Sequence, residues 1–281
     1  MISHNINPVL IDFGVLQIRY YGLFYVIGLI ITYFFIRYYI QKYKKTIGFK
    51  LECEDILDYV LYIAIGIIGG ARLGYFIFYE PLTLLKSPLE LVMFWHGGMS
   101  FHGGFAGAII GGLIFCKRKK LSFYKIADIT VMPLALALAI GRIGNFINGE
   151  LVGRQWSGFF CIDYSTNPHI INPPKGCRFP SQIVESLKNI FIFFTLIGIN
   201  SYRHASKKKH LPDGSLLWTF ALLYSLLRFF VEFIREPDSQ LGFIIGWLTM
   251  GQILSIFMFL FCAVMLFFLF FKKKIKKNNQ I

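Results

Sequence analysis

The sequence predicts an all-α membrane protein that crosses the bilayer several times. Of its 281 residues, 56% are hydrophobic and only 16% are charged. Apolar runs of about 20 residues, the length that a helix needs to cross a hydrocarbon core of about 30 Å, recur along the chain. Helices are expected because the bilayer core offers backbone groups no solvent to hydrogen bond. Seven apolar segments are predicted to span, at 20–40, 57–79, 97–116, 124–141, 183–201, 214–234 and 249–271.

The connections between these segments alternate in charge, and this alternation predicts their orientation. Lys and Arg crowd the connections after the first, third and fifth segments and the C-terminal end. The connections at 80–96 and 236–248 carry at least as many acidic as basic residues. Because basic loops stay in the cytoplasm, we expect an outside N-terminus, a cytoplasmic C-terminus and seven crossings. Cytoplasmic loops therefore account for the net charge of +14, and no nucleic-acid partner is expected.

A single seven-helix membrane domain, 1–281, is expected to carry four smaller parts. Three of these parts are expected on the outer side: first an interfacial segment, then a short amphipathic arm, then an irregular or β-containing head. The fourth part is a basic cytoplasmic tail. In that order they cover residues 1–19, 80–96, 142–182 and 272–281. Residues 1–18 lack the basic start and the hydrophobic region of a cleavable signal peptide, so none is expected.

The five cysteines show neither a CxxC pair nor a metal-ligand spacing, so no metal site is predicted. Cys161 and Cys177 lie in the same predicted outer loop and could form a disulfide there. Free thiols are nevertheless the expected state of both.

The stretch 141–154, GRIGNFINGELVGR, places unusual polarity at the end of an apolar span. The helix is expected to end at Arg142. Arg142, Asn145 and Glu150 would be costly beside lipid unless they face protein, water or a polar ligand. The stretch is therefore a candidate binding site.

With the predicted topology, polar residues from five of the predicted spans fall in one outer layer of the membrane. They are Tyr21, Arg72, His102, Arg142, Tyr224, Arg228 and Glu232. On the inner side, only Asp58 and Asp128 are expected, near helix ends. Arg228 and Glu232 share a helix face through their i, i+4 spacing. This one-sided distribution predicts a shared polar cavity that opens to the outer leaflet.

Each of these residues also has a structural interpretation. Arg142 and Tyr21 suit interfacial anchors, and His102 suits a hydrogen-bonded core histidine. Arg228 with Glu232 suits a bridge within one helix, and Arg72 suits an ion pair with a neighbouring helix. The glycines of the second and third segments are typical of close helix packing. It is the combination at one depth that favours a functional site.

The chemistry of the expected cavity indicates a phospholipid. Several arginines suit bidentate recognition of a phosphate, and in the outer leaflet that phosphate is a lipid headgroup. A nearby histidine can accept a proton near neutral pH, so group transfer is a possible reaction. An anion transporter is one alternative. It would need polar groups through both leaflets, and the one-sided distribution speaks against it. A phospholipid-binding protein without transferase activity is the other alternative, and it would tolerate loss of His102.

Specific motifs are spread along the whole chain. They are YYG at 20–22, GGARLGY at 69–75, GGMSFHGG at 97–104, GRIGNFINGELVGR at 141–154, RFPSQ at 178–182, LYSLLRFFVEFIREPD at 223–238 and MGQILS at 250–255. In sequence and in order they closely resemble the motifs of the bacterial prolipoprotein diacylglyceryl transferases.

The resemblance implies a seven-helix enzyme of the bacterial inner membrane with its active site facing the periplasm. Members of that family move the diacylglyceryl group of phosphatidylglycerol onto the thiol of the lipobox cysteine of a prolipoprotein, the first step of lipoprotein maturation. Glycerol 1-phosphate is released, and no metal or organic cofactor is required. The implied partners are phosphatidylglycerol, prolipoprotein signal peptides with a lipobox cysteine, and the lipid bilayer.

The resemblance also assigns roles to single residues. Arg142 matches the phosphatidylglycerol-binding arginine, and Arg228 matches a second essential arginine. Catalytic roles are expected for His102, Tyr21 and Glu150. Lipid-binding roles beside the two arginines are expected for Asn145, Gly153, Tyr224 and Glu232.

Three positions depart from the family pattern. The usual RHPSQLYE stands here as RFPSQIVE, with Phe179 in place of histidine and Val184 in place of tyrosine. Arg19 replaces a histidine that often precedes the YG pair. Phe179 therefore cannot carry a proton, while the central polar cluster is unaffected.

Overall fold

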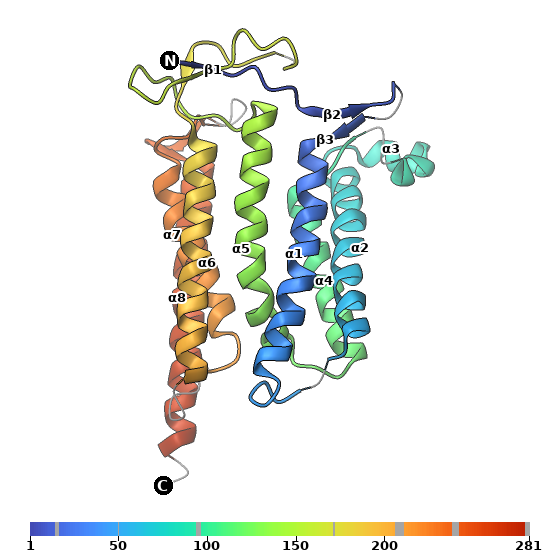
Figure 1. Cartoon of the computed structure of the whole chain (residues 1–281), viewed down its shortest axis with the longest axis vertical. Coiled ribbons are helices and arrows are strands. Elements are labelled where there is room, and N and C mark those ends of the chain that lie inside the picture. The colour runs from blue at the N-terminus through green and yellow to red at the C-terminus, as the bar shows by residue number, and fades with distance from the viewer. Residues whose placement is uncertain are drawn as a thin grey trace. The chain divides into compact units, whose positions relative to one another are not determined.

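The computed structural model is mostly helical and describes residues 1–14, 17–49, 51–93, 97–170, 172–205, 211–237 and 242–278. Its longer helices coincide with the seven predicted segments (Figure 1). They are α1 (Tyr20–Tyr43), α2 (Cys53–Phe78), α4 (Phe101–Arg118), α5 (Phe123–Asn148), α6 (Ser181–Ala205), α7 (Ser215–Val231) and α8 (Met250–Asn278). Among the described residues, five helices are long and apolar enough to cross a membrane: α1, α2, α5, α6 and α8. The chain is therefore a multi-pass membrane protein by helix length and composition.

Two helices fall short of that standard, and some predicted features are not described. α4 and α7 have 18 and 17 residues and are not among the five candidate spans. The predicted arm contains two short helices, α3 (Pro81–Lys86) and η1 (Pro88–Val92). Outside the described residues lie the end of this arm with Trp95, the basic run 207–209, and residues 279–281 of the tail.

The chain divides into two compact units, which are considered separately. Unit 1 comprises residues 1–31 and 127–281, and unit 2 comprises residues 32–126. In unit 2, α2 packs along α4 through glycines on both helices. A Cβ atom at Gly107 would overlap the carbonyl of Gly66, and one at Gly103 would overlap that of Gly70. The interpretation of these glycines as close-packing residues is confirmed.

Arg72 has a structural role in unit 2. Its buried side chain donates hydrogen bonds to backbone carbonyls of η1 and of the residues that follow it. The acceptors include Met93 at 2.8 Å and Gly98 at 3.2 Å, and the Glu90 carboxylate lies 3.8 Å away. Because carbonyls and a carboxylate surround the guanidinium, Arg72 fastens the arm to α2. This favours the structural interpretation of Arg72 over a role in binding an anion.

In unit 1, α7 lies beside both α6 and α8 (Figure 1). At one end of these helices the chain forms a small sheet of β1 (Ile2–Ser3), β4 (Ile162–Asp163) and β5 (Cys177–Arg178). β1 runs parallel to β4, and β4 runs antiparallel to β5. Two short hairpins complete the strands, β2 (Val9–Asp12) with β3 (Gln17–Arg19), and β6 (Phe243–Ile245) with β7 (Leu248–Thr249). Ile162 of β4 forms a small apolar core with Val152 and Tyr164.

The prediction that the fourth long helix ends at Arg142 was wrong. α5 continues through Gly141 and Gly144 to Asn148, so the connection to α6 begins well after residue 142. A glycine inside a helix costs only about 1 kcal/mol relative to alanine. Here Gly144 also permits close packing, since a Cβ atom there would lie 2.9 Å from Phe24 Cδ2 and 3.0 Å from Tyr21 Cδ2. Contact with α1 thus compensates for the weak helix propensity.

The expectation of free thiols at Cys161 and Cys177 was also wrong. The two residues form a disulfide with a Cα–Cα separation of 5.4 Å. The strand pairing brings the two residues close, because Ile162, which follows Cys161, lies opposite Arg178, which follows Cys177. Among the described residues, Cys53, Cys116 and Cys262 are free cysteines.

A second polar cluster joins the opposite ends of the same helices. Asp128, buried near the start of α5, accepts hydrogen bonds from the backbone N–H groups of Gly214 and Leu217, each at 2.9 Å. Arg203 near the end of α6 donates to Asp128 at 3.1 Å and to Asp213 at 3.0 Å. Asp128 therefore satisfies the first turn of α7 and fixes it to α5 and α6. The sequence placed Asp128 near a helix end but did not predict these partners.

Candidate functional site

The polar side chains of unit 1 gather around Glu185 on α6. This carboxylate is only 2% exposed, and three cations surround it. Its Oε2 atom lies 3.7 Å from Arg142 Nε and 2.6 Å from Lys188 Nζ, and its Oε1 atom lies 3.5 Å from Arg228 Nε. A buried carboxylate requires such partners because an isolated buried charge is strongly destabilising. Glu185 therefore brings residues of α5, α6 and α7 to one point.

The cation on α7 has a second acidic partner. Arg228 forms an ion pair with Glu232, as their i, i+4 spacing predicted. Glu232 Oε1 also accepts a hydrogen bond from Thr249 Oγ1 at 2.9 Å. A Cβ atom on Gly251 would lie 2.6 Å from Glu232 Oε1, so the start of α8 packs directly against this carboxylate. The pairing confirms the predicted bridge and extends it to α8.

The charges of this cluster do not cancel. Arg142, Lys188 and Arg228 carry three positive charges, whereas Glu185 and Glu232 carry two negative charges. One net positive charge therefore remains among these five partly or fully buried groups; the carboxylate of Glu150 is exposed and is not counted with them. Such an arrangement suits an anion with a single negative charge, which would complete the charge balance.

Asn145 links Arg142 to Glu150 through a chain of hydrogen bonds. Arg142 Nη1 donates to Asn145 Oδ1 at 3.2 Å, and Asn145 Nδ2 donates to Glu150 Oε1 at 2.9 Å. Asn148 Nδ2 donates to the same Glu150 oxygen at 3.1 Å. Glu150 itself is exposed, while Asn145 is buried. In this geometry Glu150 orients Asn145, which in turn orients the guanidinium of Arg142.

Two of the predicted tyrosines border the cluster. The ring of Tyr224 lies under the ammonium of Lys188, 4.0 Å from the ring centroid, which is a favourable cation–π geometry. The Tyr21 hydroxyl lies 2.8 Å from that of Tyr25, one turn along α1. Tyr21 and Tyr224 are both electrostatic neighbours of Arg142. They therefore supply hydroxyl groups on the border of a cationic site.

Gly153 lies where three backbone segments meet. Its N–H donates to the carbonyl of Phe179 at 3.0 Å, and Arg154 N–H donates to the carbonyl of Ile234 at 3.0 Å. A Cβ atom on Gly153 would lie 2.8 Å from Ile234 O and 2.9 Å from Phe179 Cβ. Only glycine fits this crossing without displacing a neighbour. The structure thus gives Gly153 a packing role, and its expected contact with lipid stays a prediction.

His102 belongs to unit 2, whereas the Glu185 cluster belongs to unit 1. It lies in the first turn of α4, and its side chain is exposed. An exposed histidine does not fit the alternative of a core histidine. Its proposed role as the base rests on the sequence resemblance.

Sequence reasoning missed Glu185 and Lys188 as site residues. The signal was present, because two charged residues at i, i+3 near the start of an apolar helix need a buried partner or a ligand. Glu185 even lies within the quoted RFPSQIVE motif. Within the described part of the chain, no group of three or more His, Cys, Asp or Glu side chains is arranged to hold a metal ion.

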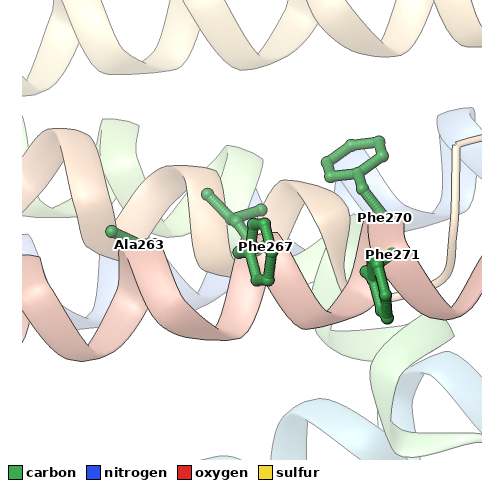
Figure 2. A pocket seen from close by; sticks show the side chains of 5 residues that line it. Ala263, Phe267, Phe270 and Phe271 are labelled. Atoms are coloured by element: carbon green, nitrogen blue, oxygen red, sulfur yellow. The ribbon is translucent and has the colours of Figure 1, made fainter.

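An apolar groove on α8 lies away from this chemistry. It has a volume of about 570 Å³ and is lined by Ala263, Leu266, Phe267, Phe270 and Phe271 (Figure 2). No polar side chain lines it, and along α8 it begins about 18 Å from Gly251 at 1.5 Å per residue. The groove cannot bind an anion and is typical of a helix face in contact with acyl chains.

Comparisons with known proteins agree with the family resemblance of the motifs. A model of the prolipoprotein diacylglyceryl transferase family matches residues 8–268. A phosphatidylglycerol–prolipoprotein diacylglyceryl transferase of Desulfotalea psychrophila is 43% identical over 267 residues, covering 94% of this chain and 93% of that protein. Similarly named proteins of Geobacter sulfurreducens and Rickettsia canadensis are 40% and 39% identical, each covering 91% of this chain and 92% and 94% of their own length.

Proposed function

Because the chain belongs to the prolipoprotein diacylglyceryl transferase family, we propose that it transfers the diacylglyceryl group of phosphatidylglycerol to the lipobox cysteine of a prolipoprotein. The cysteine sulfur forms a bond to C3 of the glycerol backbone as the bond from C3 to the phosphate oxygen breaks. Glycerol 1-phosphate leaves with the electron pair of that bond. The enzyme therefore catalyses the first step of bacterial lipoprotein maturation.

The net positive charge of the Glu185 cluster carries this proposal. Phosphatidylglycerol has one phosphodiester with a single negative charge, which matches the one unbalanced cation of the cluster. Arg142 and Arg228 come from two different helices and are held by the same carboxylate. A phosphate between them would accept charge-assisted hydrogen bonds from both sides. As the C3–O bond breaks, these fixed donors would stabilise the charge that develops on the leaving phosphate.

The incoming cysteine reacts as a thiolate, so its proton must go to a base. His102 is the residue we assign to this step, as the family resemblance suggests. Glu150 acts through Asn145 on Arg142 and is a positioning residue in this scheme. Tyr21 and Tyr224 supply hydroxyl groups beside Arg142 for the headgroup of the lipid.

The proposed arrangement in the membrane has seven spans. α4 and α7 would then cross with the five longer helices, the N-terminus would lie in the periplasm and the C-terminus in the cytoplasm. Two observations support it: basic residues crowd alternate connections, and the cystine Cys161–Cys177 suits an oxidising compartment. The active site would thus face the periplasm of a bacterial inner membrane. Accessibility of single cysteines placed at 87 and 46 to an impermeant thiol reagent tests this, with the first expected to react from outside and the second only in lysed cells.

The decisive experiment is turnover by the purified protein. With phosphatidylglycerol vesicles and a lipobox peptide, we expect lipidated peptide and glycerol 1-phosphate in equal amounts. Replacing Arg142 with Ala should lower the rate about 100-fold to 1,000-fold, the usual loss of one fixed donor at a developing charge. Arg142→Lys should recover little, because an ammonium cannot donate two parallel bonds. Arg37→Ala, which removes an exposed arginine from α1, is the matched control and should retain the wild-type rate.

Other outcomes have defined meanings. A wild-type protein that binds the lipid without forming product would be a phospholipid-binding protein without transferase activity. A folded Arg142→Ala variant with a near-normal rate would remove the phosphate-binding role of Arg142.

A further inference from the structure

Asn189 on α6 is a buried amide without a hydrogen-bond partner among the described residues. The side chain is 1% exposed, and both Oδ1 and Nδ2 lack a partner. Asn189 is four residues from Glu185 on the same helix. Nearer the N-terminal end of α6, Gln182 Oε1 is also buried and has no partner among the described residues. The unpartnered atoms therefore follow the face of α6 that carries the anion site.

An unpartnered buried amide is unfavourable for folding. Leaving a buried donor or acceptor unsatisfied destabilises a protein, and more than nine-tenths of such groups in folded proteins have a partner. A leucine of nearly the same shape would avoid this loss. The presence of asparagine here thus indicates a polar partner that binds at this point.

The position of Asn189 defines what kind of partner fits. Residues four apart on a helix lie about 6 Å apart along the axis and point in nearly the same direction. The turn before Asn189 carries the charged Glu185 and Lys188, and the turns after it carry the fully buried Ile192 and Leu196. Along α6 the order is therefore charged, then neutral and polar, then apolar.

The neighbouring helix lies opposite this face. Ser186 Oγ, one turn before Asn189, donates to the backbone carbonyl of Ala139 on α5 at 2.9 Å. Glu185 contacts Arg142, which also lies on α5. Asn189 therefore lies on the α5-facing side of α6, one turn deeper than the arginine cluster and not on the lipid-facing side.

We propose that Asn189 forms a subsite for the ester linkage of the bound glycerophospholipid, donating from Nδ2 to an ester carbonyl oxygen. The order of groups along α6 matches the order phosphate, ester and acyl chain in such a lipid. This inference rests on the proposed function, because it places the phosphate of the same lipid between Arg142 and Arg228. Asn189 is then a residue that distinguishes ester-linked from ether-linked lipids, since an ether lacks the carbonyl acceptor.

The test compares diester phosphatidylglycerol with its diether analogue, which has the same headgroup and chain length. Binding to the purified full-length protein in nanodiscs is measured for both lipids, and turnover is measured with a lipobox peptide. The wild-type protein should bind the diester lipid about fivefold to tenfold more tightly, the effect of one hydrogen bond to a buried group. Asn189→Leu should bind both lipids with the affinity that the wild-type protein has for the diether.

Two controls separate this role from a structural one. Asn189→Leu should be as thermally stable as the wild type or more so, because it removes an unsatisfied buried amide. A large loss of stability would show that Asn189 has a structural partner and would overturn the proposal. Thr195→Val removes a hydroxyl that, within the described part of the chain, donates to the backbone of its own helix at Phe191 O, and it should keep the preference for the diester.

The remaining outcomes are also decisive. An equal diester-to-diether ratio in the wild type and in Asn189→Leu would overturn the subsite and would indicate that a buried water satisfies Asn189. Because binding is measured without the peptide, this result is independent of turnover. A wild-type protein that prefers the diester yet forms no product would support the subsite and refute the proposed transferase reaction.

Discussion

The Oε2 atom of Glu185 lies 3.7 Å from the Nε atom of Arg142, and these two residues come from different helices. The other oxygen of the same carboxylate lies 3.5 Å from Arg228 Nε. One buried acid therefore contacts two guanidinium groups from two other helices and holds them in place. Fixed donors of this kind need little rearrangement during a reaction, which is the main source of their catalytic effect.

We predict that Glu185→Gln slows transfer by at least about tenfold and lowers thermal stability. The amide keeps the shape of the side chain but leaves three cations with one carboxylate, and removing one partner of a buried ion pair typically costs about 3–5 kcal/mol. The loss should appear in kcat, because the arginines are no longer held in place. Steady-state kinetics with varied phosphatidylglycerol and a thermal unfolding curve measure the two effects.

Glu54→Gln, at an exposed position in the first turn of α2, is the matched control and should change neither value. Tighter lipid binding with an unchanged kcat would contradict the prediction. In that case Glu185 would act as a competitor of the phosphate and not as a holder of the arginines.

A second prediction concerns Gly153. In Gly153→Ala the new methyl group would lie 2.8 Å from Ile234 O and 2.9 Å from Phe179 Cβ, so two backbone segments must move apart. Such overpacking typically costs about 1–3 kcal/mol. We expect a lower melting temperature and a lower transfer rate, because the Phe179 segment leads directly into α6 and Glu185.

Gly141→Ala provides the comparison within the same motif. Nothing lies within 4 Å of a Cβ atom at Gly141, and alanine favours a helix over glycine by about 1 kcal/mol. This variant should be as stable as the wild type or more stable. Equal losses in both variants would show that the motif requires glycine for a reason other than the crossing at Gly153.

The sequence predicted the helices better than their ends. The length of the apolar segments locates all seven longer helices, because burial in a bilayer selects for such runs. The end of α5 was misplaced because Gly141 and Gly144 suggest a break, while packing against α1 supports the helix. Local propensity cannot report a contact with a residue more than a hundred positions away.

Three charged residues of the Glu185 cluster were named from the sequence, but Glu185 itself was not. Arg142, Arg228 and Glu232 are charged residues within or next to apolar segments, so their cost in a membrane makes them visible in the sequence. Glu185 was missed because its significance depends on which cations surround it. The partners of Arg72 favour its structural interpretation, since its guanidinium donates to backbone carbonyls of η1.

The Cys161–Cys177 disulfide should stabilise the head locally. Closing a loop of this length, 16 residues apart in sequence, is worth about 3 kcal/mol in the chain-entropy estimate. In the double variant Cys161→Ser with Cys177→Ser, hydrogen exchange at Ile2 and Trp156 should accelerate, because their N–H groups donate to the carbonyls of Cys161 and Cys177 at 2.9 Å. Exchange in α2 should not change.

Cys53→Ser, which replaces an exposed free cysteine, is the control for this experiment and should leave exchange in the head unchanged. Unchanged exchange at Ile2 and Trp156 in the double variant would show that strand pairing alone holds the head. A wild-type protein that reacts with thiol reagents at both positions would show that the disulfide does not form.

The last prediction concerns the attachment of the N-terminal segment through His4. The imidazole is only 3% exposed, between the rings of Phe146 and Tyr164, and burial lowers the pKa of His4 below its ordinary value of 6.5. Its Nδ1 atom lies 2.9 Å from Asn167 Nδ2, and a protonated imidazole could not accept that hydrogen bond. Burial raises the pKa of Tyr164 to about 12, so the neighbouring phenol stays neutral.

His4 binds a proton more readily in the detached segment than in the docked one, because its pKa is lower when docked. The contribution of His4 to docking is therefore fully present above pH 6.5. It is lost as the pH falls through the lower pKa of the docked state. Hydrogen exchange at the Ile2 and His4 amides, corrected for the intrinsic effect of pH, should therefore accelerate below that value. His4→Gln keeps a polar group but cannot titrate, so its exchange should not depend on pH in this way. The same acceleration in His4→Gln would assign the pH dependence to another group in the head.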